Sequence, residues 1–135
     1  MESRTKDLLQ LRPTIANALV YDSMSQEERF QNETLRPVIK LQNDLLLEVF
    51  RNYANKHKGV FYTLSLEKQL RYIDNAIQKD IKFRNSLKGM VIGQFTQEEY
   101  LHYIENSSAL NKRMMKIVIE RLKDQIQLID RDCVA

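Results

Sequence analysis

Residues 96–130 read TQEEYLHYIENSSALNKRMMKIVIERLKDQIQLID, and this stretch decides the fold. Thr96 and Glu99 have the spacing of a capping box, in which each side chain accepts a hydrogen bond from the backbone N–H of the other residue. The stretch therefore predicts one helix from residue 96 toward residue 130. A bend is expected at residues 106–108, because asparagine and serine are poor helix formers.

Apolar side chains lie on two faces of this predicted helix. One face carries Tyr100, Leu101, Ile104, Met115, Val118, Ile119, Leu122, Ile126 and Ile129. The second face carries Tyr103, Leu110, Met114, Ile117 and Leu128, with Arg121 among them. A surface helix normally has a single apolar stripe, so the second face either lies beneath the N-terminal helices as core or forms an interface. Aromatic, methionine and arginine side chains are enriched at interfaces, although methionine fills cores equally well.

Two further long helices are predicted upstream of residue 96. Apolar residues recur at helical spacing through residues 35–56, where Pro37 suits the first turn, and through residues 66–88, where Ser65 suits the N-cap. Shorter helices are expected within residues 5–20 and 25–34. The sequence thus predicts an all-α fold, a helical bundle of three long amphipathic helices plus short N-terminal helices, in a single domain spanning residues 1–135.

The composition fits a soluble cytoplasmic protein. The 135 residues are 43% hydrophobic and 29% charged, with only three glycines and two prolines. The lone cysteine, Cys133, cannot form an intramolecular disulfide, which favours a reducing compartment. Neither a signal peptide nor a run of about 20 apolar residues is present, so we expect no membrane association.

Polar residues interrupt two of the apolar faces. Gln42 falls within the apolar stripe of residues 35–56, and Ser107, Ser108 and Asn111 interrupt the last helix. Small residues let helices approach closely while the amides bond to each other, which is the favoured interpretation. The alternative is a polar pocket for a small ligand, in which these four residues meet across the bundle.

Cations dominate residues 66–88, within a chain of net charge +3. Arg84 and Lys88 end its apolar line. The favoured interpretation is that Arg84 forms an ion pair with Asp80 and that both long side chains cover the edge of the core. The alternative is a site for an anion or an acidic partner. A stripe along the opposite face contains the cations Lys68, Arg71, Lys79 and Lys82. Such a stripe is usually a solvated face; the alternative is a surface that binds the phosphates of nucleic acid. The last helix adds five cations that are interpreted as scattered around it: Lys112, Arg113, Lys116, Arg121 and Lys123.

Catalytic motifs are missing from the sequence. Glu99 and His102 have the Glu-x-x-His spacing of di-iron bundles, but the other histidine, His57, has Ala54 where its glutamate would stand. There is no Gly-x-Ser-x-Gly elbow, and the sequence around Cys133 gives no cue for activation by a base. We therefore predict no catalytic residue, no metal site and no cofactor.

Three segments carry a resemblance to a known group of proteins. Residues 80–90 (DIKFRNSLKGM), 93–96 (GQFT) and 106–114 (NSSALNKRM) resemble small uncharacterised all-helical bacterial proteins that sometimes carry a glyoxalase label. The resemblance implies a compact helical domain. Glyoxalase-type enzymes use βαβββ modules and metal-binding histidine and glutamate side chains, and this sequence has no matching set, so no catalytic residue carries over.

The first functional hypothesis is a non-enzymatic domain that forms a homo-oligomer or binds a protein partner through the second face of the last helix. Binding of nucleic acid or an anionic ligand through residues 68–88 is the alternative. The third hypothesis is a small-molecule-binding protein or enzyme with a polar pocket between helices.

Overall fold

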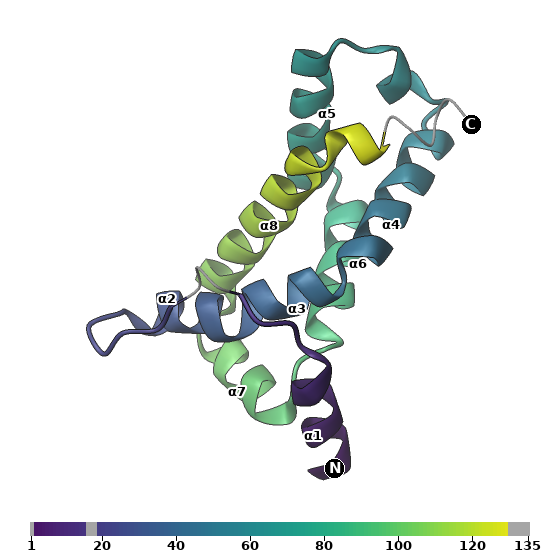
Figure 1. Ribbon diagram of the computed structural model, residues 1–135. Helices are drawn as coiled ribbons and strands as arrows, with labels where there is room; N and C mark the ends of the chain where they lie inside the picture. Colours follow the sequence, from purple (N-terminus) through teal and green to yellow (C-terminus); the bar gives the residue numbers. More distant parts are fainter. Residues whose placement is uncertain (1, 16–18, 130–135) are drawn as a thin grey trace.

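Each of the three predicted long helices is divided into two in the structure, a computed structural model that describes residues 2–15 and 19–129 (Figure 1). The fold is all-α, and no strand occurs among these residues. Its elements are α1 (Glu2–Leu11), α2 (Gln26–Phe30), a π-helical turn (Gln31–Leu35), α3 (Arg36–Leu41), α4 (Asn43–Lys56), a 3-10 turn (Val60–Thr63), α5 (Leu66–Lys79), α6 (Ile81–Ile92), α7 (Gln97–Glu105) and α8 (Ser107–Asp124). The predicted all-α class is thus confirmed, whereas the predicted three long helices plus short N-terminal ones are replaced by eight α-helices in the described residues.

A polar residue stands at each of the three divisions. Asp80 has extended backbone angles (φ −86°, ψ 98°), and its side chain accepts a 3.2 Å hydrogen bond from the Phe83 N–H, so it caps the N-terminus of α6. Asn106 (φ −148°, ψ 46°) separates α7 from α8, which confirms the bend expected at residues 106–108. Gln42 (φ −86°, ψ 4°) only bends the chain between α3 and α4, since backbone hydrogen bonds continue through it.

Helix α8 lies at the centre of the fold, where it packs against the π-helical turn and α3 to α7. Tyr103, Leu110, Met114 and Ile117 are only 7%, 3%, 0% and 7% exposed. The prediction that these residues form an interface was wrong, because the second apolar face is covered by the chain itself and belongs to the core. Leu128 is the exception on that face, with 42% of its surface exposed.

The orientation of α7 also differs from the expectation. Tyr100, Leu101 and Ile104 are 46%, 60% and 50% exposed, although the periodicity places them with the buried residues of α8. The backbone of Asn106 leaves the helical region, so the face of α7 is no longer in register with that of α8. Tyr103 turns inward instead, where its ring packs edge-on against Phe95 at 5.8 Å.

The N-terminal segment is attached through arginines more than through apolar packing. Arg4 donates to the carbonyl oxygens of Phe95 (2.9 Å) and Gly93 (3.0 Å), while Leu9 and Leu11 remain 52% and 63% exposed. In Figure 1 α1 extends from the end of the bundle formed by the α6–α7 connection. Arginine contacts thus fix α1 beside the start of α7.

None of the described helices has the length and apolar character needed to span a membrane. Cys133 lies outside the described residues.

Candidate functional site

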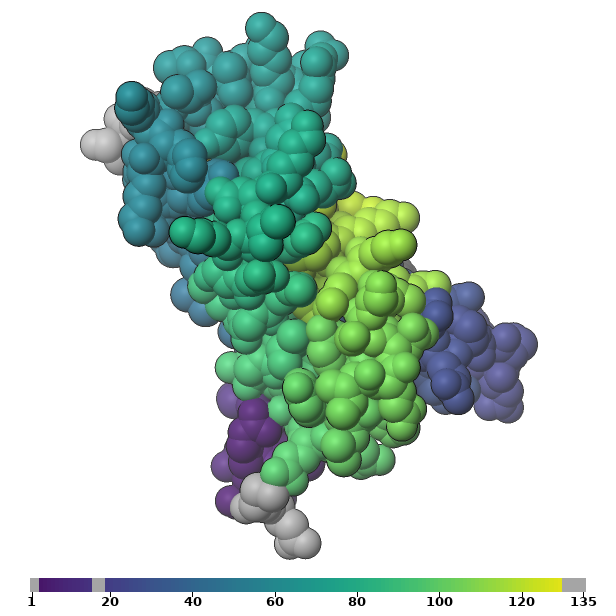
Figure 2. Space-filling model, turned by 180° about the vertical axis from the view of Figure 1, so that it is seen from behind, coloured from purple at the N-terminus to yellow at the C-terminus, as the bar shows by residue number. Residues whose placement is uncertain are grey.

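A groove of about 860 Å³ runs between α8 on one side and α5 and α6 on the other. Figure 2 shows this face of the molecule, with α5 and α6 in teal and green beside the yellow-green α8. The groove is lined by Asp74, Gln78, Arg84, Lys88, Ser108, Asn111, Lys112, Met115, Lys116, Ile119, Glu120 and Lys123. Cations are thus the most frequent kind of side chain in its lining.

Helical periodicity brings the cations together. Lys112, Lys116 and Lys123 fall within about 40° of one another around α8 at 100° per residue, and all three line the groove. On the facing side, Arg84 and Lys88 are four residues apart on α6. Met115 and Ile119, 7% and 6% exposed, form the floor between the two rows.

The groove has an excess of positive charge, with five cationic side chains against the carboxylates of Asp74 and Glu120. Lys123 pairs with Asp74, and Arg84 donates to the Gln78 carbonyl oxygen at 3.3 Å. Across the part of the chain that the structure describes, the amines of Lys88, Lys112 and Lys116 have no protein partner. Three lysines are therefore available to a ligand.

Four residues predicted as ligand-binding meet in this groove: Arg84, Lys88, Ser108 and Asn111. Gln42 does not join them, because its side-chain amide donates to the Met90 carbonyl oxygen at 2.9 Å. Ser107 is also absent from the lining. The polar residues thus do not meet as one pocket across the bundle. Asn111 accepts a hydrogen bond from the Tyr103 hydroxyl.

The predicted nucleic-acid stripe spans two helices. Lys68, Arg71 and Lys79 lie on α5, whereas Lys82 lies on α6. None of these four lines the groove; Arg71 pairs with Glu67 at 2.6 Å, and Lys79 and Lys82 flank a different hollow. The description of the α8 cations as scattered was wrong for Lys112, Lys116 and Lys123, which share a face that the 4- and 7-residue spacings already indicate. It holds for Arg113 and Arg121, which contact Glu27 and Asn43 outside the groove.

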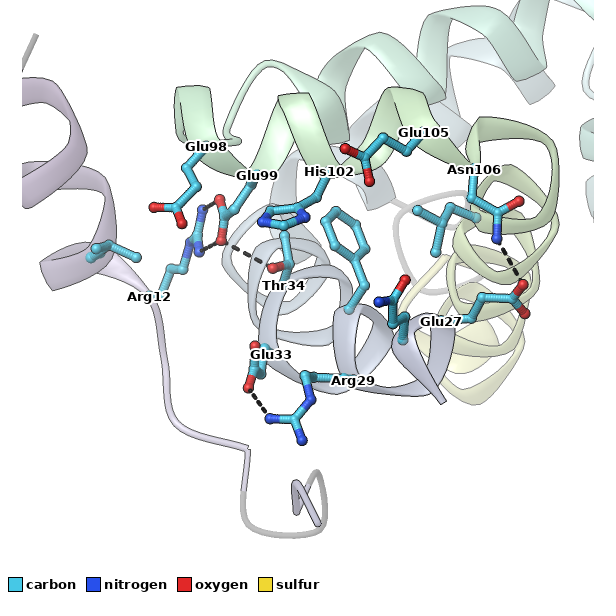
Figure 3. Close-up of a pocket in the computed structure, with 14 residues that line it drawn as sticks. Arg12, Glu27, Arg29, Glu33, Thr34, Glu98, Glu99, His102, Glu105 and Asn106 are labelled. Carbon is cyan, nitrogen blue, oxygen red and sulfur yellow. Dashed lines mark hydrogen bonds and ion pairs between the residues drawn. The ribbon is translucent and has the colours of Figure 1, made fainter. Parts of the chain in front are cut away.

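A second, smaller pocket of about 550 Å³ lies between α7 and the segment formed by α2 and the π-helical turn. In Figure 3 Glu99 points toward Arg12 and Thr34 at one end of this pocket. Arg12 donates to both carboxylate oxygens of Glu99 at 2.6 Å, and the Thr34 hydroxyl donates at 3.0 Å. Glu99 also accepts from the Thr96 backbone at 2.8 Å, which completes the predicted capping box.

The charge of Glu99 is compensated within the protein. Burial alone would raise the pKa of its carboxyl, but the hydrogen bonds from Arg12, Thr96 and Thr34 and the Arg12 charge outweigh burial, so the pKa lies below its ordinary value. Elsewhere in the pocket, Arg29 pairs with Glu33 and Arg113 with Glu27. Glu99 therefore fastens the N-terminal segment, an interaction that the sequence analysis missed because nothing local links Arg12 to it.

The Glu99 and His102 pair does not form part of a metal site in the described residues, which contain no group of three histidine, cysteine, aspartate or glutamate side chains able to hold an ion. Glu99 is committed to Arg12.

Tyr53 and Asp80 form a further polar contact at the α5–α6 junction. The Tyr53 hydroxyl donates to Asp80 at 2.9 Å. Burial, followed by this hydrogen bond and the Asp80 charge, raises the pKa of Tyr53 to about 12. The Phe83 N–H and the Tyr53 hydroxyl together lower the pKa of Asp80. The Asp80 carboxylate is thus used as a helix cap and tyrosine acceptor, and not as the partner expected for Arg84.

Comparison with known proteins adds no relative: no protein-family model, curated protein or solved structure matches this chain. The resemblance to small helical bacterial proteins stays a prediction.

Proposed function

We propose that this protein binds an anionic ligand in the groove between α8 and α5–α6. The observation that supports this function is the opposition of two cation rows, Arg84 and Lys88 on α6 and Lys112 and Lys116 on α8, across one groove. Cations on both sides of a concave site focus a positive potential that attracts carboxylate or phosphate groups. Three of these side chains have no partner within the described protein to satisfy them.

The second pocket supports an anion site less well, since glutamates outnumber arginines in its lining. Its two arginines already contact glutamates. The groove is the site where charge is left uncompensated, and its lysines extend from well-formed helices.

Charge reversal tests the proposal. Calorimetric titration with inorganic tripolyphosphate and with polyglutamate should show binding that weakens as salt is raised. The variant Lys112→Glu/Lys116→Glu should bind at least about tenfold more weakly. Its control is Lys68→Glu/Lys79→Glu, two exposed lysines of α5 outside the groove, which should change affinity less than about twofold. Equal losses in both variants, or no binding of either anion by the parent protein, would contradict the proposal.

A second candidate function is association with a second copy of the chain through α7. Tyr100, Leu101 and Ile104 expose one apolar face of this helix, and contiguous exposed apolar surface often marks an interface. This candidate keeps the idea of self-association but moves it away from the buried face of α8.

Light scattering on a size-exclusion column tests this candidate. Across a dilution series, the parent protein should elute as a dimer and Leu101→Glu/Ile104→Glu as a monomer. Leu66→Glu changes a leucine that is 59% exposed on α5 and should leave the dimer intact. A parent protein that is monomeric at every concentration removes the candidate.

A further inference from the structure

The groove combines charge with an apolar floor, and this combination limits which anionic ligand fits. Met115 and Ile119 are four residues apart along the floor. Lys112 and Lys116 repeat at the same spacing on α8, as do Arg84 and Lys88 on α6. Four residues of helix advance by about 6 Å, so all three rows have the same axial repeat.

The two walls of the groove run in opposite chain directions, with α8 on one side and α5 followed by α6 on the other. Lys123, near the end of α8, pairs with Asp74 of α5, whereas Ser108, at the start of α8, shares the groove with Lys88 of α6. Residues 108–123 of α8 cover about 22 Å. A groove of this length between helices matches about fifteen residues of a further helix, whose side chains repeat at the same spacing.

We infer that the groove binds an amphipathic α-helix of a partner protein, with a narrow apolar strip flanked on both sides by acidic side chains. This inference rests on the proposed anion-binding function and names the ligand class. The apolar strip lies on Met115 and Ile119, and the two acidic rows meet Lys112 and Lys116 on one side and Arg84 and Lys88 on the other. The aliphatic stems of these long side chains add carbon surface to the contact.

The lining favours such a helix over single-stranded nucleic acid. Proteins that bind single strands use aromatic side chains on which bases stack, and the groove has none. Its wall also includes the exposed carboxylate of Glu120, which would repel a continuous row of phosphates. A peptide helix can place a neutral or basic residue opposite Glu120, because its charges vary from residue to residue.

Three fluorescently labelled probes test the ligand class by anisotropy. The first is a peptide of about fifteen residues with leucines along one helical face and glutamates on both flanks. The second is the same composition in an order that removes the amphipathic pattern, and the third is a single-stranded DNA of about the same charge. We expect the amphipathic peptide to bind at least about tenfold more tightly than the other two.

Two variants locate the contact. Lys112→Glu/Lys116→Glu should lower the affinity for the amphipathic peptide by at least about tenfold. Met115→Gln keeps the side-chain size and the groove charge but makes the floor polar. It should therefore lower the affinity for the amphipathic peptide while leaving tripolyphosphate binding unchanged. Circular dichroism and thermal melting of each variant identify any loss of fold, and the charge-reversal pair, whose side chains are exposed, keeps the test valid if Met115→Gln unfolds.

The outcomes separate the inference from the function on which it rests. Equal affinity for the two peptides would mean that charge alone governs binding, which overturns the helix inference and leaves the anion-binding function standing. Tighter binding of the DNA would replace the partner helix with nucleic acid. No binding of any probe or of tripolyphosphate would overturn both.

Discussion

Replacing Glu99 by glutamine should destabilise the fold far more than the same replacement at an exposed ion pair. The side chains of Arg12 and Glu99 are 7% and 17% exposed, and two hydrogen bonds of 2.6 Å join them. Glutamine keeps the shape of the side chain, but it turns one acceptor oxygen into an NH₂ donor that faces the guanidinium. The Arg12 charge is then buried without a counter-charge.

The size of the loss follows from burial and from the other contacts of Arg12. Removing one partner of a buried ion pair costs about 3–5 kcal/mol. Arg12 also donates to the Gln94 carbonyl oxygen at 3.0 Å, and the N-terminal segment can separate from α7, which limits the penalty. We therefore expect the free energy of unfolding to fall by about 3 kcal/mol and Tm by about 10 °C for a chain of this size.

Urea denaturation followed by circular dichroism measures this loss. The control is Glu67→Gln, which removes the same charge from a pair whose side chains are 80% (Glu67) and 65% (Arg71) exposed and should cost less than about 1 kcal/mol. Arg12→Ala and the double variant complete a double-mutant cycle. Equal effects of Glu99→Gln and Glu67→Gln, or strictly additive effects in the cycle, would refute the conclusion that Arg12 and Glu99 stabilise the fold as a buried pair.

Four other predictions concern Glu99, Tyr53, Met114 and Gly59. The pKa of Glu99 in the folded state lies below its ordinary value of 4.5. The stabilisation that its charge provides is therefore complete above pH 4.5 and is lost as the pH falls through the folded pKa. In urea titrations at several acidic pH values, the free energy of unfolding should depend less on pH for Glu99→Gln than for the parent protein. Spectrophotometric titration should find a tyrosine with a pKa of about 12, absent in Tyr53→Phe and shifted toward 10 in Asp80→Asn. Met114→Ala should lower the free energy of unfolding by about 2–5 kcal/mol, because it leaves a cavity in the core. The exposed Leu128→Ala should cost less than about 1 kcal/mol. Similar values would argue against burial of the second apolar face of the last helix. Gly59→Ala should lower the free energy of unfolding by about 1–2 kcal/mol in thermal denaturation, because Gly59 has φ +65°.

Local signals were enough to locate the helices but not to divide them correctly. Ser65 caps α5 and Thr96 caps α7 as the sequence predicts, since capping depends on residues a few positions apart. Asp80 carries an equally strong capping signal, but the apolar repeat continues through it to Ile81, which is 62% exposed. Periodicity over residues 66–88 therefore concealed a helix boundary that a single aspartate decides.

The core and the groove depend on how the divided helices pack, which periodicity along one helix does not specify. The second apolar face of the last helix could have been core or an interface. It is core, because neighbouring helices bury residues such as Met114. Arg84 and Lys88 could be recognised as cations at the end of an apolar line, but only the antiparallel placement of α8 brings Lys112 and Lys116 opposite them. The Asp80 carboxylate accepts from the Phe83 N–H and the Tyr53 hydroxyl, and Arg84 donates instead to the Gln78 carbonyl oxygen at the groove. The unbroken helix and the Asp80–Arg84 ion pair were thus wrong for the same reason, because the Asp80 side chain caps the N-terminus of α6.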